Sequence, residues 1–178
     1  MSDAAPDPDC PPLPQARLLA SVLPIIRSRG RRYRKFLQVR ARPARPGEEV
    51  VTVTADGEET RNRAGEDHLL VQNLTAAGER YLMRRQSFAA RYRRVEDAGA
   101  GWALYDAFGE ILALEIDPGL QALLGVGASF HIVAPWGRPQ VARAGDMLAA
   151  PWPALDEIYR IARREFEETY RATAAPGE

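Results

Sequence analysis

An internal repeat is the feature that most constrains what this chain can fold into, since a missed repeat misassigns a whole architecture. Residues 50–65 align with residues 129–145. The matched pairs are Val53 with Val133, Gly57 with Gly137, and Arg63-Ala64-Gly65 with Arg143-Ala144-Gly145. After a one-residue shift, Asp67 and Leu69 match Asp146 and Leu148. The ordered identities, tied to turn glycines, indicate a duplicated unit.

The repeat continues in residues 79–92, which align with residues 157–170. Here the matches are Glu79, Tyr81, Arg85, Phe88 and Tyr92 with Glu157, Tyr159, Arg163, Phe166 and Tyr170. A Phe and a Tyr four residues apart lie on one face of a helix. Each copy is therefore predicted to end in a short helix whose aromatic side chains close one end of a curled sheet.

The predicted fold class is α+β, mostly β: two tandem curled antiparallel units, small and barrel-like, each closed by a short C-terminal helix. Alternating or β-branched residues predict strands at 36–41, 50–55 and 69–72. A tight turn is expected at Asp56-Gly57. Residues 102–105 and 110–116 are expected to pair as a hairpin. Apolar residues at helical spacing over 15–28 predict an N-terminal amphipathic helix that Pro24 kinks or divides.

These elements divide the chain at polar segments. We expect an unstructured tail at 1–14, the N-terminal helix with the first repeat at 15–95, a linker at 96–101, the second repeat at 101–172, and a tail at 173–178. A unit of this size is marginal alone, so the two repeats are expected to bury apolar area against each other.

Composition narrows the functional classes. Lys and Arg number 24 and Asp and Glu number 24, so the chain has no net field that would favour nucleic acid or an anionic membrane. Cys10 is the single cysteine, which excludes an internal disulfide and a cysteine metal cluster. The start lacks the pattern of a signal peptide, and no run is long enough to span a membrane. We expect a cytoplasmic bacterial protein without metal or cofactor.

The repeat resembles the PGDYG-motif domain family of small bacterial and phage proteins, in two diverged copies. The first copy carries the resemblance through Gly65, Asp67, Glu79, Tyr81, Phe88 and Tyr92, and the second through Gly145, Asp146, Glu157, Tyr159, Phe166 and Tyr170. Ala64 and Ala144 stand where the motif has proline, and neither copy keeps the motif tyrosine. The resemblance implies a fold unit and no activity.

Candidate catalytic residues are few. His68 beside Asp67 suggests a general base oriented by a carboxylate, although neighbours on a strand point to opposite faces. The remaining candidates are His131, Asp146 and Glu79. Aspartates after turn glycines ordinarily bond their own backbone, so Asp67 and Asp146 are interpreted as structural.

The predicted function is a non-enzymatic binding or accessory protein that holds a small ligand or a protein partner near the interface between the repeats. Its candidate ligand-binding residues are Tyr81, Trp136, Tyr159 and Arg85. A small-metabolite hydrolase or isomerase with a histidine and carboxylate site is the alternative. A second alternative is a nucleic-acid-binding protein that uses Arg31, Arg32 and Arg34 of the basic segment 27–35. A homodimer is compatible with all three, and no membrane partner is expected.

Overall fold

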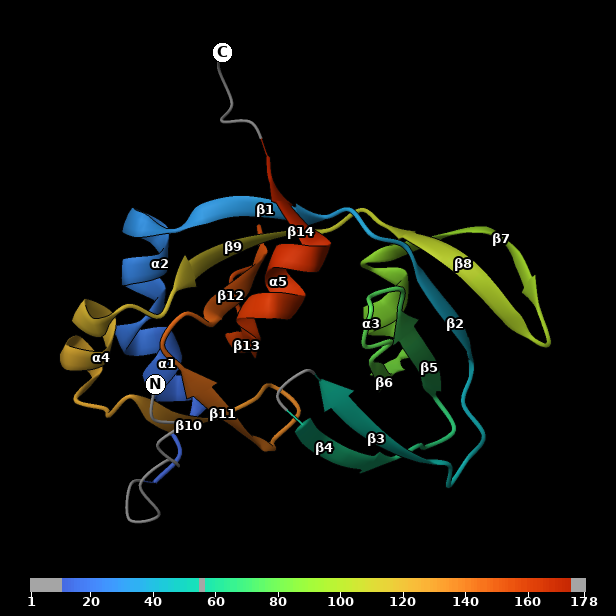
Figure 1. Cartoon of the computed structure of the whole chain (residues 1–178), viewed down its shortest axis with the longest axis horizontal. Helices are drawn as coiled ribbons and strands as arrows, with labels where there is room; N and C mark the ends of the chain where they lie inside the picture. Colours follow the sequence, from blue (N-terminus) through green and yellow to red (C-terminus); the bar gives the residue numbers. More distant parts are fainter. Residues whose placement is uncertain (1–10, 55–56, 174–178) are drawn as a thin grey trace. The chain divides into compact units, whose positions relative to one another are not determined.

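The computed structural model describes residues 11–54 and 57–173, so the predicted turn residue Asp56 and the single cysteine Cys10 lie outside the described residues. The fold is α+β and mostly β, as predicted (Figure 1). The helices are α1 (Gln15–Ser21), α2 (Leu23–Arg29), α3 (Arg85–Ala89), α4 (Pro118–Leu124) and α5 (Arg163–Thr169). The strands of the first repeat are β1 (Arg31–Lys35), β2 (Val39–Pro43), β3 (Glu49–Thr54), β4 (Gly57–Arg63), β5 (His68–Asn73), β6 (Arg80–Arg84) and β7 (Tyr92–Gly99). Those of the second are β8 (Trp102–Ala107), β9 (Glu110–Glu115), β10 (Ser129–Val133), β11 (Pro139–Arg143), β12 (Met147–Trp152), β13 (Tyr159–Ile161) and β14 (Tyr170–Ala172).

The described chain forms two compact units whose segments alternate along the sequence. Unit 1 holds residues 11–33, 110–166 and 172–173, and unit 2 holds residues 34–109 and 167–171. They therefore differ from the contiguous repeats 15–95 and 101–172 that the sequence predicts. The difference arises because segments that close each sheet come from distant parts of the chain.

The two five-stranded sheets have the same strand order. One runs β6-β5-β2-β8-β7 and the other β13-β12-β9-β1-β14. Each sheet thus takes the sixth, fifth, second and seventh strands of one repeat and the first strand of the other repeat. Each repeat also forms a separate two-stranded hairpin, β3-β4 or β10-β11. The same strand order thus recurs in both sheets, with the first strands exchanged between them.

An aromatic contact recurs at the exchanged strand. Tyr105 of β8 meets Phe88 of α3 edge-on, with ring centroids 4.8 Å apart and planes at 84°. Tyr33 of β1 meets Phe166 of α5 in the same way, at 4.8 Å and 74°. Edge-on aromatic pairs are stabilised beyond the area they bury. The predicted short helices therefore do pack on the sheets, and the phenylalanine of each meets the strand that the other repeat contributes. The prediction that Tyr92 and Tyr170 share a helical face with these phenylalanines is wrong, because the helices end earlier and the tyrosines begin β7 and β14.

The backbone hydrogen bonds just after the exchanged strand are also the same in the two units. The Phe36 N–H donates to the carbonyl of Thr169 at 2.9 Å, and the Phe108 N–H donates to the carbonyl of Arg91 at 3.0 Å. Phe36 and Phe108 each follow the exchanged strand, so the same backbone geometry recurs at both places.

Three sequence expectations are wrong in detail. Residues 102–105 and 110–116 do form strands, but β8 pairs with β2 and β7 while β9 pairs with β12, so they make no hairpin with each other. The predicted linker 96–101 is largely strand, because β7 extends to Gly99. Leu13 of the predicted tail is buried and exchanges backbone hydrogen bonds with His131 and Val133.

The predicted N-terminal helix is divided, as expected, near Pro24. Helix α1 ends at Ser21, and α2 begins at Leu23 with the proline in its first turn, where its missing N–H costs no hydrogen bond. The Gln15 side chain fixes α1: its Nε2 donates to the Val133 carbonyl at 2.7 Å, and its Oε1 accepts from the Ile158 N–H at 2.9 Å. None of the helices in the described part of the chain has the length and apolar character to cross a membrane.

The aromatic pairing at the exchanged strand makes a prediction. A double-mutant cycle on Phe88→Leu and Tyr105→Leu should give a coupling of about 0.5–1.5 kcal/mol in the free energy of unfolding, because the two rings interact directly. Denaturation by urea measures it. The control cycle pairs Phe88→Leu with Val50→Ala, which belongs to a separate core cluster, and should be additive. Additive effects for Phe88 and Tyr105 would refute the contact.

Candidate functional site

The two units can be compared position by position, because their strand ladders share one register. In unit 2, Ala41 lies opposite Val71, which lies opposite Tyr81. In unit 1, Ala113 lies opposite Ala149, which lies opposite Tyr159. The remaining residues of the three strands in one unit correspond to those of the other unit in the same register.

In unit 1 one face of the sheet is largely apolar and covered, with the buried Arg160 of β13 as a charged exception. Leu112 and Leu114 of β9 and Leu148 and Ala150 of β12 belong to one buried cluster, together with Ile158 just before β13. The residues that cover them from the N-terminal helices are Leu18, Val22 and Ile26. This face is a hydrophobic core that α1 and α2 complete.

In unit 2 the corresponding positions are largely polar. At the positions of Leu112 and Leu114 in unit 1, unit 2 has Arg40 and Arg42. Gln72 takes the place of Ala150. Arg80 takes the place of Ile158, since each comes directly before the matched tyrosine of its unit. Helices α1 and α2 belong to unit 1, and α3 packs on the opposite face of the unit 2 sheet, against Val39, Ala41 and Val71. We call the polar side, with Arg40, Arg42, Gln72, Arg80 and Trp102, the arginine face.

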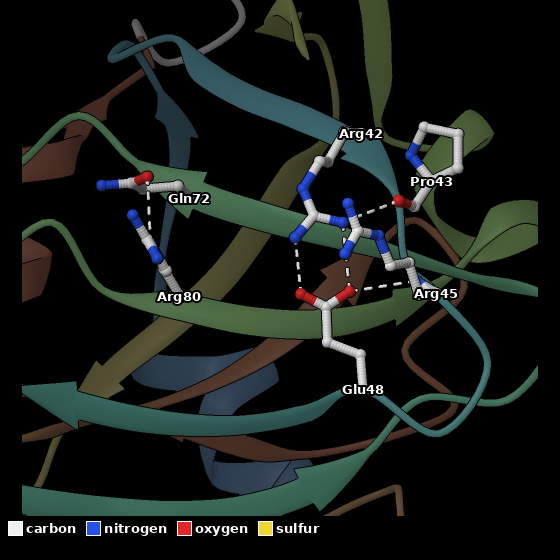
Figure 2. A network of polar contacts seen from close by, with 6 residues as sticks. All are labelled: Arg42, Pro43, Arg45, Glu48, Gln72 and Arg80. Carbon is white, nitrogen blue, oxygen red and sulfur yellow. Dashed lines mark hydrogen bonds and ion pairs between the residues drawn. The ribbon is translucent and has the colours of Figure 1, made fainter. Parts of the chain in front are cut away.

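Two guanidinium groups of the arginine face converge on a single neutral oxygen. Arg40 donates from Nε and Nη2 to Gln72 Oε1, at 3.0 and 2.8 Å. Arg80 Nε donates to the same atom at 3.2 Å (Figure 2). Among the side chains that the structure describes, those of residues 11–53 and 61–173, no carboxylate lies within ion-pair distance of either guanidinium. No described carboxylate therefore balances the positive charges of Arg40 and Arg80, although both groups donate to the same oxygen.

The neighbouring Arg42, by contrast, is neutralised. Its Nη1 lies 3.0 Å from Glu48 Oε2 and its Nη2 bonds Glu48 Oε1, so the pair is bidentate (Figure 2). Residues 45–48 form a turn in which Gly47 has φ +81°, closed by the Glu48 N–H donating to the Arg45 carbonyl. Pro46 before a positive-φ glycine is typical of a type II turn. The turn aims the Glu48 carboxylate back at the sheet, where it also accepts from the Arg45 N–H at 3.0 Å.

The hydrogen bonds from the Arg42 side chain hold the pKa of the Glu48 carboxyl below its usual value, and the Arg45 N–H adds to the effect while burial opposes it. Glu48 is therefore a fixed anion that compensates Arg42 but not Arg40 or Arg80.

An indole ring completes the face. The Cζ atoms of Arg40 and Arg42 lie 4.9 and 5.2 Å from the centre of the Trp102 ring. Cation–π contact of this kind orients a guanidinium plane and lowers its mobility. Trp102 also packs with the partly covering hairpin through the cluster Ala44, Val50, Ala64, Leu70 and Leu82.

The predicted His68 and Asp67 dyad is not formed. His68 Nδ1 accepts a hydrogen bond from the Gly65 N–H at 3.1 Å, which makes the imidazole a cap of its own turn. Asp67 is exposed, and its Oδ1 lies 3.8 Å from Arg85 Nε. The ladder register also aligns His68, and not Asp67, with Asp146. The predicted match of Asp67 with Asp146 is therefore wrong, because the first turn is longer by two residues.

Asp146 is a buried structural anion. Its Oδ2 lies 2.9 Å from Arg160 Nε and accepts from the Arg143 N–H at 3.0 Å, and its Oδ1 accepts from the Arg163 N–H at 3.1 Å. The side chains of Asp146 and Arg160 are 7% and 3% exposed. The Arg143 bond has the same spacing as the bond from Gly65 to His68, so an aspartate and a histidine cap equivalent turns.

The other candidate catalytic residues occupy structural places. Glu79 is buried, accepts from the Thr75 hydroxyl, and its carbonyl accepts from the Asn73 N–H. His131 is half-buried on β10 opposite Val141. In the described part of the chain, neither histidine has a carboxylate within 4.0 Å, and no group of three or more His, Cys, Asp or Glu residues is placed to hold a metal.

The four predicted ligand-binding residues are divided between the units. In unit 2, Tyr81 packs in the cluster beneath α3, with its hydroxyl 3.4 Å from that of Tyr92, and Arg85 begins α3. In unit 1, Tyr159 lies half-buried on β13, and Trp136 lies in the β10-β11 turn with 53% of its surface exposed.

Three of the basic residues in the segment 27–35 are held by polar side chains. Arg29 pairs with Asp117, and Arg32 bonds Glu110 while its Cζ lies 5.0 Å from the Trp152 ring centre. Lys35, the single lysine, is buried with its Nζ 2.7 Å from Asn73 Oδ1. Arg31 and Arg34 are exposed on β1. The segment therefore offers less free positive charge than its sequence suggests.

Comparison with known proteins adds no relative. No protein-family model, curated protein or solved structure matches the chain. The resemblance to the PGDYG-motif family stays a prediction, and the site is argued from geometry alone.

The buried pair of Asp146 makes a second prediction. Asp146→Asn should lower the free energy of unfolding by about 3–5 kcal/mol, because it removes the charge of a buried carboxylate that Arg160 Nε and the N–H groups of Arg143 and Arg163 bond. Asp67→Asn, its exposed counterpart in the sequence alignment, should change it by less than about 0.5 kcal/mol. Equal effects in chemical denaturation would contradict the assignment of Asp146 as the structural anion.

The ion pair between Glu48 and Arg42 makes a third prediction. Its folded-state pKa is lowered, so its contribution to stability is present above the unfolded-state pKa and is lost as the pH falls through the folded-state pKa. Carboxyl NMR titration should place its midpoint below that of an ordinary glutamate, and Arg42→Gln should raise it. The stability difference between wild type and Glu48→Gln should be largest near neutral pH and vanish in acid. An unshifted midpoint would show that the bidentate pair is absent in solution.

Proposed function

We propose that the chain is a non-enzymatic binding protein whose ligand is an anion, held on the arginine face of unit 2. The single observation that supports this most is the convergence of Arg40 and Arg80 on Gln72 Oε1 without a carboxylate partner. A phosphoryl or carboxylate oxygen would supply the charge that the neutral amide lacks, and guanidinium groups bind such oxygens in a fork geometry.

The comparison between the units supports the same role. Leucine and alanine at the equivalent positions of unit 1 are covered by helices and make a core. Folding this type of sheet therefore does not require arginine at these positions. The requirements of folding, as unit 1 meets them, therefore do not account for the arginines on this face of unit 2.

A binding role fits the described residues better than the enzymatic alternative. The catalytic candidates Asp146 and Glu79 are occupied by structural hydrogen bonds, and the His68 imidazole caps a turn. General acid-base chemistry requires a titratable group in reach of a substrate. The arginine face offers positive charge and hydrogen-bond donors, which are the requirements for holding an anion.

The experimental test introduces a carboxylate on the arginine face by substitution. Gln72→Glu places a negative charge between Arg40 and Arg80, so it should preserve or raise the melting temperature and weaken pyrophosphate binding by about tenfold or more, since hydrogen bonds to charged groups contribute roughly 1.5–3 kcal/mol. Isothermal titration calorimetry with pyrophosphate measures the affinity. Arg80→Gln should weaken it similarly.

The matched control is Arg138→Gln, which removes an exposed arginine of unit 1 and should leave the affinity unchanged. Wild-type protein that binds neither pyrophosphate nor phosphate would refute the proposal. So would a Gln72→Glu variant that binds pyrophosphate as tightly as wild type.

A further inference from the structure

We infer that strand β7 is a self-complementary sheet edge along which a second copy of this chain binds. The inference goes beyond the proposed function, because it uses none of the residues that define the arginine face. In the unit 2 sheet β7 pairs with β8 on one side and forms the edge on the other (Figure 1). An edge strand presents a row of N–H and C=O groups that another strand can pair with.

The β7 edge is long and open. The strand has eight residues, and every residue from Arg93 to Gly99 is exposed. In the described part of the chain, residues 92–99 make no backbone hydrogen bonds outside the ladder with β8. The strand at the same place in the unit 1 sheet, β14, has only three residues. The length of β7 therefore exceeds what this type of sheet needs in order to form.

A β-bulge decides which charges of β7 share a face. The ladder with β8 shifts between Arg94 and Glu96, which leaves Val95 as an extra residue. In a regular strand, residues three apart point to opposite faces. The extra residue reverses this alternation, so Arg93 and Glu96 lie on one face and Arg94 and Asp97 on the other. A second shift follows Asp97, so the segment between the two ends of regular pairing is 92–97.

One pair of these charges is satisfied within the chain and the other is not. Arg94 bonds Asp97 on its own face. Among the described side chains, neither Arg93 nor Glu96 has an oppositely charged group within ion-pair distance, although Asp106 lies across the ladder from Arg93. One face of the edge therefore carries one positive and one negative group, each exposed and without an ion-pair partner.

Twofold symmetry matches these two groups to each other. An axis normal to the sheet relates two antiparallel edge strands and keeps the same face of each copy on the same side. When Arg93 of one copy lies opposite Glu96 of the second copy, symmetry places Glu96 of the first opposite Arg93 of the second. Opposite charges directly across a ladder stabilise it. The same register uses the whole segment 92–97 of both copies and covers Val95, which is 48% exposed.

The experiment is sedimentation equilibrium of the full chain from about 10 μM to about 1 mM, because one pair of edge strands belongs to the small, weak class of interfaces. Wild type should dimerise within this range. Arg93→Glu and Glu96→Arg each put like charges opposite each other at two symmetric places, so each should weaken the dimer by about tenfold or more. The matched control is Arg138→Glu, which reverses an exposed charge of unit 1 and should leave dimerisation unchanged.

Restoring the complementarity separates a direct pairing from a general effect of charge. The double variant Arg93→Glu, Glu96→Arg again places opposite charges across the axis and should dimerise as wild type does. An equimolar mixture of the two single variants should form a heterodimer for the same reason. Unchanged melting temperatures of the single variants should show that they remain folded.

Three results would overturn the inference. Wild type could stay monomeric throughout the concentration range. A dimer that Arg93→Glu weakens no more than Arg138→Glu does would place the interface elsewhere. A dimer that the single variants weaken, but that neither the double variant nor the mixture restores, would show that Arg93 and Glu96 do not meet across the axis.

Discussion

The exchange of the first strand is the constraint on which the rest of the structure depends. β8 fills the place between β2 and β7, and β1 fills the place between β9 and β14. Without the exchanged strand, a sheet would leave the N–H and C=O groups of two neighbours unpaired, which is costly wherever water is excluded. The exchanged strand also carries the tyrosine that meets the helix phenylalanine in each unit. The backbone ladder and the aromatic core therefore depend on the same exchange.

The common framework makes the differences between the units informative. Both sheets have the same order and register, so a change of residue type at an equivalent position reflects a change in what that face contacts. Leucine at 112 and 114 faces the N-terminal helices, whereas arginine at 40 and 42 faces Trp102, Gln72 and the Glu48 turn. In unit 1 this face is a covered core, and in unit 2 it is a polar surface with arginines near its edge.

The same comparison explains why an overall neutral chain can hold a local anion site. Glu48 compensates Arg42, and Asp146 compensates Arg160, each through short and directed hydrogen bonds. Among the described side chains, the hydrogen bonds of the Arg40 and Arg80 guanidinium groups go to the Gln72 amide oxygen. Net charge describes the field far from the molecule, whereas binding depends on charges that lack a local partner.

Much of the fold could be predicted from the sequence, because local patterns encode it. The alternating residues of β2 and β5, the β-branched run of β3, and the helix dividing near Pro24 are all visible in short windows. The alternation in β2 even carried a signal for the site: polar residues at every second position indicate a sheet face that is not core. What the sequence could not show is which strands pair.

Pairing was missed because it depends on distant residues. Residues 102–105 and 110–116 are separated by a short connection, which is typical of a hairpin, yet each pairs with strands far away in the chain. The site escaped prediction for the same reason, since Arg40, Gln72 and Arg80 come from three strands and converge only in the sheet. The basic segment 27–35 looked more promising because its charges are adjacent in sequence, but neighbours such as Glu110 and Asp117 neutralise part of them.

The most direct measurement of the central claim is a methyl NOESY spectrum of the full chain with labelled alanine. Ala41 and Ala103 lie directly opposite each other where β2 pairs with the exchanged strand β8, and the β-carbons of such a pair are about 4.5–5.5 Å apart. The account predicts a strong cross-peak between these two methyl groups. Cross-strand contacts that instead place residues 102–107 opposite residues 110–115 would contradict the exchange, and with it the position-by-position comparison from which the arginine face was identified.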